Sequence, residues 1–284
     1  MSVRAVTIQD ILSGTADLPV FGETTSRLLK ETATEDAPPS RVAELLSQDQ
    51  SLAMRVLRLA NSAYFGLPRR IDSIPQAVLI LGLNRVRHIT LAASSYVWLQ
   101  RPLGGYFVSP RELWIHSMGT ASWSKLIANL SGLDPEAAFT SGLVHDIGKV
   151  ALCAWHDERM KAIVRFAQRQ NMPYDEAERR VFGFDHAEIG ARLCESWNLP
   201  SVIVEAVRWH HRADNAPENL PLADCVHAAI GLNTLAGRSI DQPAMSEDEC
   251  VYACAKLGLD LEIVLAKAEE VVISLMDMEQ ALAA

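Results

Sequence analysis

The sequence predicts an all-α protein, and two observations lead to this expectation. Apolar residues recur at the i, i+3, i+4 and i+7 spacing of an amphipathic helix through most of the 284 residues. No segment shows the strict alternation of polar and apolar residues, flanked by hairpin turns, that is typical of a half-buried strand. With 49% hydrophobic and 21% charged residues, the chain has enough apolar material to bury a sizeable core.

The first part of the chain is expected to form a helical half over residues 1–105. Its expected helices cover residues 8–12, 21–32, 41–47, 49–60, 74–81 and 85–99. Ser40 and Ser73 stand where N-caps are needed, and Gly82 stands where a helix is expected to end. The proline and two glycines of residues 101–105 mark the best candidate boundary in the chain.

The rest of the chain is expected to hold a second helical half over residues 106–235 and a helical tail over residues 236–284. The helices of this second half are expected at residues 110–130, 135–154, 160–170, 174–181, 186–197 and 200–211, with another beginning at Leu222. A break is expected near residues 241–243, where an aspartate and a proline interrupt the helical pattern.

The charge balance disfavours broad binding to nucleic acid. The 26 basic residues are outnumbered by 35 acidic ones, and a chain with a net charge of −9 repels the phosphate backbone. A local basic patch would have to come from a few arginines, for which solvated helix faces are the more ordinary explanation. These arginines are Arg55, Arg58, Arg69, Arg70, Arg85 and Arg87.

Cysteine usage and hydropathy predict a cytoplasmic protein without a membrane span. The five cysteines form no C-x-x-C pair, and an odd number without a secretory leader is typical of reduced thiols. Charged residues interrupt residues 1–19, so no signal peptide is expected there. No apolar run approaches the roughly 18 residues that a membrane span needs.

His145 and Asp146, in the segment GLVHDIGK, are the first candidates for chemistry. On a helix, Lys149 would follow them by four and three residues, so all three would edge one side. Imidazole and carboxylate together suit a borderline or hard divalent ion such as Mn, Fe, Zn or Mg. Gly148 would let another helix or a substrate approach closely. A single His-Asp pair, however, is more often structural than metal-binding.

Four other histidines accompany this pair. His116 precedes it, His186 follows it, and His210 and His211 close a further expected helix. Each lies near a helix end or on a helix that could face the interior of a bundle, where metal sites are often built from facing helices. Taken together, the set makes a metal or anion site as reasonable as a purely structural role.

The order of these histidines around the His-Asp pair resembles the HD-domain superfamily of metal-dependent phosphohydrolases. The N-terminal half is similar to the HDOD family, an HD-related output domain, in Leu18-Pro19 and in the segment VLRLANSAY at residues 56–64. The segments DHAEIG at residues 185–190 and WNLP at residues 197–200 are further signatures. The resemblance covers residues 18–236. It implies an HD-like helical bundle with an additional N-terminal half, and a role in bacterial signalling.

The resemblance also implies two metal subsites. The first divalent ion would be bound by His116, His145 and Asp146. The second would be bound by His186, His210 and His211. Lys149 would provide the additional positive charge that phosphoester hydrolysis needs, and would count as catalytic only if the site is active.

One position departs from an active HD enzyme. The resemblance implies a closing aspartate at residue 230, where this chain has Ile230, which cannot bind a metal. Asp224 precedes that position by six residues, which places it about 240° around a helix and roughly 9 Å along it. His227 is closer to the required face, but a helical histidine beside core residues is the more ordinary explanation. The site is therefore expected to be incomplete, and catalysis to be lost or marginal.

Three functions are open at this point. The first is a regulatory HDOD protein with a degenerate metal site, acting through a signalling protein partner or a nucleotide-like small ligand. The second is a metal-dependent phosphohydrolase acting on a nucleotide or a signalling nucleotide. Cyclic-di-GMP hydrolysis is not expected, because no Gly-Tyr-Pro segment follows His210-His211. The third, a nucleic-acid binder, rests only on the six arginines.

Overall fold

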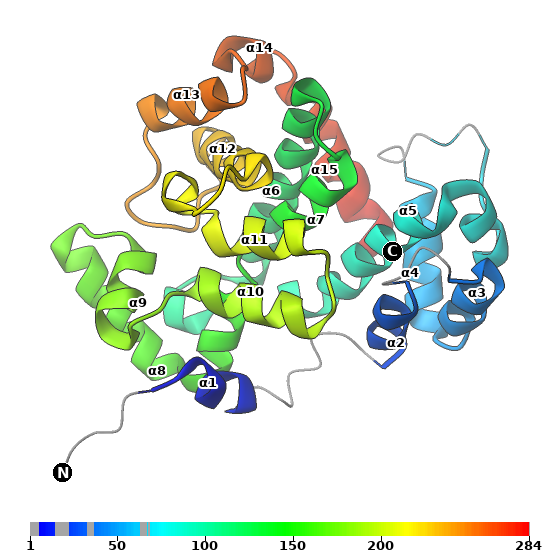
Figure 1. Cartoon of the computed structure of the whole chain (residues 1–284), viewed down its shortest axis with the longest axis horizontal. Helices are drawn as coiled ribbons and strands as arrows, with labels where there is room; N and C mark the ends of the chain where they lie inside the picture. Colours follow the sequence, from blue (N-terminus) through cyan, green and yellow to red (C-terminus); the bar gives the residue numbers. More distant parts are fainter. Residues whose placement is uncertain (1–5, 15–22, 33–36, 63–66, 68, 284) are drawn as a thin grey trace.

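The computed structural model describes residues 6–14, 23–32, 37–62, 67 and 69–283, and this part of the chain consists of helices joined by loops and turns. Within these residues the only β-type pairing is an isolated bridge between Leu103 and Val108. The predicted all-α class is confirmed, with an N-terminal helical half beside a second helical bundle (Figure 1). Leu18-Pro19 and residues 63–64, which carried part of the resemblance, lie outside the described residues.

The N-terminal half is built from α1 (Ile8–Gly14), α2 (Glu23–Glu31), α3 (Pro39–Ser47), α4 (Gln50–Ala60) and α5 (Ile74–Leu99). Helices α2, α3 and α4 pack against α5, whereas α1 packs against the second half of the molecule (Figure 1). Ser73 caps α5 as expected, and the positive φ of 77° at Gly82 interrupts that helix before it resumes. The expected cap at Ser40 was wrong. Helix α3 begins at Pro39, because the fixed φ of proline suits the first helical turn.

The second half is built from α6 (Pro110–Ser131), α7 (Pro135–Val144), α8 (Ile147–Gln170), α9 (Tyr174–Phe182), α10 (His186–Ser196), α11 (Ser201–Trp209) and α12 (Pro221–Leu235). Helix α6 packs against both α7 and α12, while α10 packs against both α8 and α11 (Figure 1). This arrangement brings the chain segments that carry the histidines together in the interior of the bundle.

The helix expected over residues 135–154 is two helices. It breaks at His145 and Asp146, which lie between α7 and α8. The His145 ring donates through Nδ1 to the carbonyl of Gly142 at 2.8 Å. A side chain, instead of a backbone amide of the next helical turn, thus hydrogen-bonds to a carbonyl at the end of α7. Helix α8 then continues to Gln170 through a kink at His156, where a break had been expected. His145 and Asp146 are therefore placed by a helix junction, not by one continuous helix face.

Residues 101–106 contain a packed turn. The short 3-10 helix η2 (Gly104–Tyr106) lies against α8. A Cβ atom at Gly105 would come within 2.9 Å of Cys153 Sγ, so only glycine allows this approach without rearrangement. The domain boundary expected at this segment stays a prediction.

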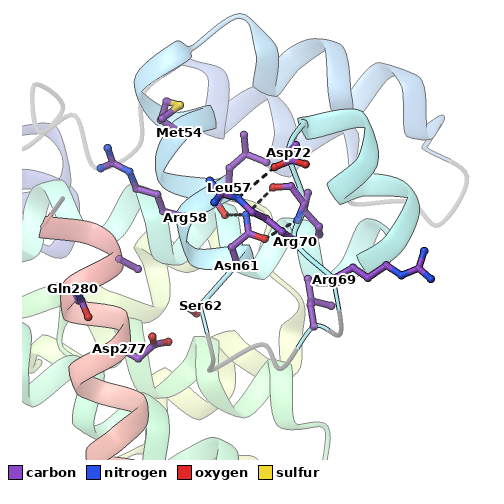
Figure 2. Close-up of a pocket in the computed structure, with 13 residues that line it drawn as sticks. Met54, Leu57, Arg58, Asn61, Ser62, Arg69, Arg70, Asp72, Asp277 and Gln280 are labelled. Carbon is purple, nitrogen blue, oxygen red and sulfur yellow. Dashed lines mark hydrogen bonds and ion pairs between the residues drawn. The ribbon is translucent and has the colours of Figure 1, made fainter.

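The C-terminal tail forms α13 (Glu247–Lys256), α14 (Leu261–Leu265) and α15 (Ala268–Ala283). Helix α15 returns along the molecule to pack against α6 and α4, so the tail touches both halves (Figure 1). A cavity of about 670 Å³ lies between α4 and α15, lined in part by Arg58, Arg69 and Arg70 (Figure 2). Arg87 is buried and donates to the carbonyl of Thr32, so it is not available to a surface patch.

Two further features concern membrane spans and the cysteines. No helix in the described ranges combines the length and the apolar character that crossing a membrane requires. The five cysteines are free and buried.

Candidate metal centre

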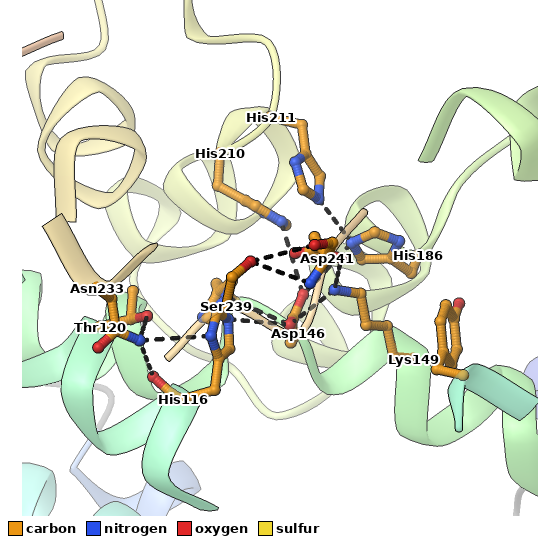
Figure 3. Close-up of polar contacts among 12 residues, drawn as sticks. His116, Thr120, Asp146, Lys149, His186, His210, His211, Asn233, Ser239 and Asp241 are labelled. Atoms are coloured by element: carbon orange, nitrogen blue, oxygen red, sulfur yellow. Dashed lines mark hydrogen bonds and ion pairs between the residues drawn. The ribbon is translucent and has the colours of Figure 1, made fainter. Parts of the chain in front are cut away.

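The six residues expected to bind metal converge in one buried region (Figure 3). His116 comes from α6, and His145 and Asp146 from the junction of α7 and α8. His186 is the first residue of α10, and His210 and His211 follow α11 directly. All of them are buried except His211, which is partly buried.

The first ligand group consists of His116, His145 and Asp146. Asp146 Oδ2 lies 3.5 Å from His116 Nε2 and 3.4 Å from His145 Nε2. The two Nε2 atoms are 3.2 Å apart. The three ligand atoms therefore surround one small volume.

The second ligand group consists of Asp146 with His186, His210 and His211. Its ligand atoms all lie within 4.8 Å of one another. Asp146 Oδ1 faces this group, at 3.4 Å from His186 Nε2 and 3.9 Å from His210 Nε2. Because its other oxygen faces the first group, Asp146 belongs to both and is placed to bridge two ions.

Hydrogen bonds at Nδ1 orient three of the rings. A backbone carbonyl can only accept a hydrogen bond, so a ring nitrogen bonded to one carries the proton. A neutral ring then has its lone pair on Nε2, which is the tautomer that a metal needs. These bonds are His116 to Arg238 at 2.9 Å, His145 to Gly142 at 2.8 Å and His210 to Val207 at 2.6 Å.

Glu178 orients the fourth ring, and sequence reasoning missed it. This residue of α9 is fully buried and accepts from His186 Nδ1 at 2.8 Å and from the Tyr106 hydroxyl at 2.6 Å. A carboxylate behind a ligating histidine is a common feature of metal sites. The expected helix over residues 174–181 placed Glu178 on α9, but nothing in the local sequence shows that it faces His186.

Unpaired polar atoms point into the same region. Asp146 Oδ1, His210 Nε2 and Asp241 Oδ2 are buried without a hydrogen-bond partner in the described part of the chain. Buried polar atoms are nearly always paired, so unpaired ones need an explanation such as an ion. All three are electron-pair donors. The donor set of imidazole nitrogens and carboxylate oxygens therefore fits a divalent cation such as Mn, Fe or Zn.

The protonation states of His116, His210 and Asp146 agree with this fit, and that of His186 does not. Burial lowers the pKa of His116 to about 4 and lowers the pKa of His210 well below its ordinary value, which keeps both rings neutral. Burial opposes ionisation of Asp146, but His145 and the Lys149 ammonium outweigh it and hold the pKa of that carboxyl well below its usual value. At His186 the Glu178 carboxylate outweighs burial and raises the pKa to about 10, so this ring is protonated and a metal ion must displace its Nε2 proton to bind there.

Lys149 is fully buried and contacts two carboxylates. Its Nζ atom lies 2.9 Å from Asp146 Oδ2 and 2.5 Å from Asp241 Oδ1 (Figure 3). These carboxylates outweigh burial and raise the pKa of Lys149 above its ordinary value. The ammonium is therefore charged but engaged within the protein. Asp241 was expected only as part of a helix break, and its contact with Lys149 spans 92 residues of sequence.

The positions considered for the closing acid on α12 take other roles. Ile230 is buried and offers no ligand. Asp224 pairs with Lys256, away from the ligand groups. His227 donates through Nδ1 to the carbonyl of His210 at 2.7 Å, so it supports the backbone of a candidate ligand. Asn233, which sequence reasoning missed, donates to the carbonyl of His116 at 3.0 Å.

A cavity of about 210 Å³ adjoins the centre. His211, Ile230 and Asp241 form part of its wall, which also carries the carboxylates of Asp175 and Glu249. No lysine or arginine lines it among the described residues. An acidic cavity of this kind attracts cations and repels free phosphate.

The chain is similar to one known protein family and to proteins from other organisms. The HDOD domain model matches residues 18–213. An uncharacterized protein of Treponema pallidum is 27% identical over 204 residues, which are 71% of this chain and 39% of that relative. The chain thus spans well under half the length of this relative.

Two solved structures share the fold over nearly their whole length. An HDOD domain protein of unknown function from Geobacter sulfurreducens has a TM-score of 0.75 at 24% identity, covering 97% of this chain and 99% of the other. A candidate phosphohydrolase from Shewanella amazonensis SB2B has a TM-score of 0.72 at 26% identity, covering 98% and 99%. These similarities support the helical architecture described above.

Proposed function

Because the chain belongs to the HDOD family, we propose that it is a bacterial signal-transduction protein whose buried centre binds divalent metal without efficient turnover. One observation carries the proposal. Ring nitrogens oriented for ligation and an unpaired carboxylate oxygen lie together in one buried region. The two subsites are those of His116, His145 and Asp146, and of Asp146, His186, His210 and His211.

The surroundings of Lys149 favour binding over catalysis. Phosphoester hydrolysis at such a centre draws on metal ions to polarise the phosphoryl group and on a nearby positive charge to stabilise it. Lys149 contacts the carboxylates of Asp146 and Asp241 instead. The adjoining cavity presents carboxylates, which disfavour an anionic substrate. At about 210 Å³, it is also smaller than the roughly 300–1,000 Å³ typical of ligand pockets, so a whole nucleotide fits poorly.

The N-terminal half is the proposed contact surface for a signalling protein partner. Met54 on α4 and Leu79 and Ile80 on α5 are exposed by 52%, 84% and 48%. Exposed apolar side chains are typical of protein-interaction surfaces where they form a contiguous patch. The free, buried cysteines agree with the cytoplasm as the compartment in which this contact takes place.

A metal-dependent phosphohydrolase is the second candidate, and the shared position of Asp146 favours it. A carboxylate between two ligand groups suits the two-metal arrangement of many phosphoester hydrolases. The Shewanella protein of similar fold is described as a candidate phosphohydrolase. In this case Lys149 would have to leave Asp241 to meet the phosphoryl oxygens. Nucleic-acid binding has less support, because Arg87 is buried and Arg55 donates to the carbonyl of Ala93.

A turnover assay separates the two candidates. The full chain, loaded with manganese, iron or zinc in turn, is incubated with bis(4-nitrophenyl) phosphate and with 4-nitrophenyl phosphate. A metal-binding regulatory protein gives no more product than the matched variants His145→Ala and Asp146→Ala. Turnover by the wild-type protein that both substitutions abolish would establish the phosphohydrolase instead.

A further inference from the structure

The two oxygens of the buried Glu178 carboxylate have different hydrogen-bond donors. Oε2 accepts from the backbone amide of His186 at 2.7 Å and from the Nδ1 atom of the same residue at 2.8 Å. Oε1 accepts from the Tyr106 hydroxyl at 2.6 Å, which is its only donor in the described part of the chain. A buried acceptor without a donor is costly. The Tyr106 hydroxyl therefore keeps the carboxylate from rotating toward other donors.

The position of the His186 ring depends on this carboxylate. Because Nδ1 is bonded to Glu178, the nitrogen that can meet a metal is Nε2. Nε2 lies 2.8 Å from His211 Nε2 and 3.4 Å from Asp146 Oδ1 (Figure 3). A partner behind a ligating histidine fixes the orientation of its ring. Rotation of the Glu178 carboxylate would thus move Nε2 relative to the other atoms of the second ligand group.

Tyr106 is itself held firmly, in the turn that joins α5 to α6. Leu103 and Val108 exchange backbone hydrogen bonds at 3.0 and 3.1 Å across this turn, and the Tyr106 amide donates to the Leu103 carbonyl at 3.0 Å. The Tyr106 ring is buried, with the Lys149 ammonium 5.7 Å from its centroid, within the range of a cation–π contact. The hydroxyl that reaches Glu178 therefore has a fixed position.

We propose that Tyr106 is a positioning residue of the second metal subsite and acts on His186 through Glu178. The assignment rests on the proposed metal centre. The Tyr106 hydroxyl bonds to Glu178 and not to a ligand, so its effect is to fix the carboxylate that orients the ring. Because Tyr106 belongs to the turn between α5 and α6, the connection between the two helical halves contributes to the geometry of the subsite.

The test is calorimetric titration of the chelator-treated full chain with manganese(II) alone, where the wild-type protein is expected to show two binding steps. Tyr106→Phe, which keeps the ring, is expected to weaken one step by about three- to tenfold, the net effect of one hydrogen bond, and to leave the other step unchanged. Glu178→Gln is expected to weaken the same step by about 10–100-fold. The control Tyr174→Phe removes the hydroxyl of a neighbouring ring, which accepts from Gln168, and should leave both steps unchanged.

The double variant shows whether Tyr106 acts through Glu178. Residues in one hydrogen-bond network have non-additive effects. Adding Tyr106→Phe to Glu178→Gln is therefore expected to cause little further loss of affinity. A loss by the same factor in both backgrounds would mean that Tyr106 contributes only to the general stability of the fold, and would overturn the assignment.

The outcomes separate this inference from the proposed function. No manganese binding by the wild-type protein overturns both. Two wild-type steps that persist with unchanged affinity in the folded Tyr106→Phe variant overturn only the role of Tyr106. If circular dichroism shows that this variant does not fold, amide hydrogen exchange of the wild-type protein decides the question. Manganese is then expected to slow exchange at the amides of Leu103, Tyr106 and Val108, because binding at His186 stabilises the bonds behind it. Unchanged exchange at these amides overturns the assignment.

Discussion

The Nε2 atoms of His116 and His145 face each other at 3.2 Å. Both rings donate through Nδ1 to backbone carbonyls, so in their neutral forms two lone pairs are directed at each other. A cation between them removes this repulsion and binds only the folded chain. We therefore expect chelation to lower the unfolding midpoint and manganese to restore it.

The size of this effect follows from mass action. At a free metal concentration 100 times the dissociation constant, the folded state gains about 2.7 kcal/mol. His145→Ala is expected to abolish most of this gain, and His156→Ala, which alters an exposed histidine of α8, to leave it intact. Thermal denaturation with and without metal provides the measurement. An equal shift in both variants would mean that the metal binds elsewhere.

Replacement of Lys149 should destabilise the metal-free protein more than the metal-bound protein. Lys149→Met removes the ammonium from the buried carboxylate of Asp146 and from the partly buried carboxylate of Asp241, and breaking a buried pair in this way costs about 3–5 kcal/mol. A divalent ion near these carboxylates replaces part of the lost charge, so manganese should reduce the penalty. Denaturant titration measures both values. Lys161→Met, at a surface pair with Glu158, is the control and should show little change. A penalty that is the same with and without metal would contradict a centre at these carboxylates.

Substitution of Gly148 tests how the second ligand group is positioned. The expectation of a close approach at this glycine is confirmed, and the approaching element is α10. A Cβ atom at Gly148 would collide with the backbone carbonyl of His186. Gly148→Ala is therefore expected to push α10 away from α8 and to destabilise the fold by about 1–3 kcal/mol, the usual cost of overpacking. It should also weaken metal binding, because His186 moves with α10. Thermal denaturation and metal titration of the variant measure both effects, and wild-type values for both would show that the two helices separate freely.

His88 predicts a specific pH dependence of stability away from the metal centre. Its Nδ1 atom lies 2.5 Å from Thr140 Oγ1, and burial lowers the pKa of His88 to about 4. In the unfolded chain its pKa is about 6.5, so between these values the unfolded state binds more protons than the folded state. The unfolding free energy must therefore fall as the pH falls from about 6.5 to about 4, by at most about 1.4 kcal/mol per pH unit for this group.

The variant His88→Gln isolates that contribution. It carries no ionisable ring, so its unfolding free energy should depend less on pH in this window than that of the wild-type protein. Denaturant titrations at several pH values, with chelator present throughout, give the two slopes. Parallel slopes would show that His88 is protonated to the same extent in both states.

The sequence predicts the fold well because helix periodicity and cap residues are local signals. The cap at Ser73 and the interruption at Gly82 are of this kind. The break between α7 and α8 was missed, because the His145 side chain ends α7 by donating a hydrogen bond to the Gly142 carbonyl. The spacing of apolar residues carries no information about such a contact. The order of the histidines along the chain is what resembles the HD-domain superfamily. The structure brings these histidines together from α6, from α10, from the junction of α7 and α8, and from the segment after α11.

Other parts of the centre could not be predicted, because they depend on contacts between distant segments. Glu178 looks like an ordinary acidic residue of an amphipathic helix until α10 places His186 against it. Asp241 lies two residues before a proline in a segment that predicts only a break, and its partner Lys149 lies 92 residues away. A missing ligand at position 230 could be read from the sequence.

The metal content of the full chain tests the account most directly. After reconstitution with manganese and removal of excess ion, elemental analysis is expected to find about two ions per wild-type chain, as in other two-metal sites. Asp146→Asn should hold fewer than one, because Asp146 serves both ligand groups. Asp157→Asn, at a surface pair with Lys161, should match the wild-type protein. A wild-type chain without metal, or an Asp146→Asn variant with undiminished content, would contradict the centre described above.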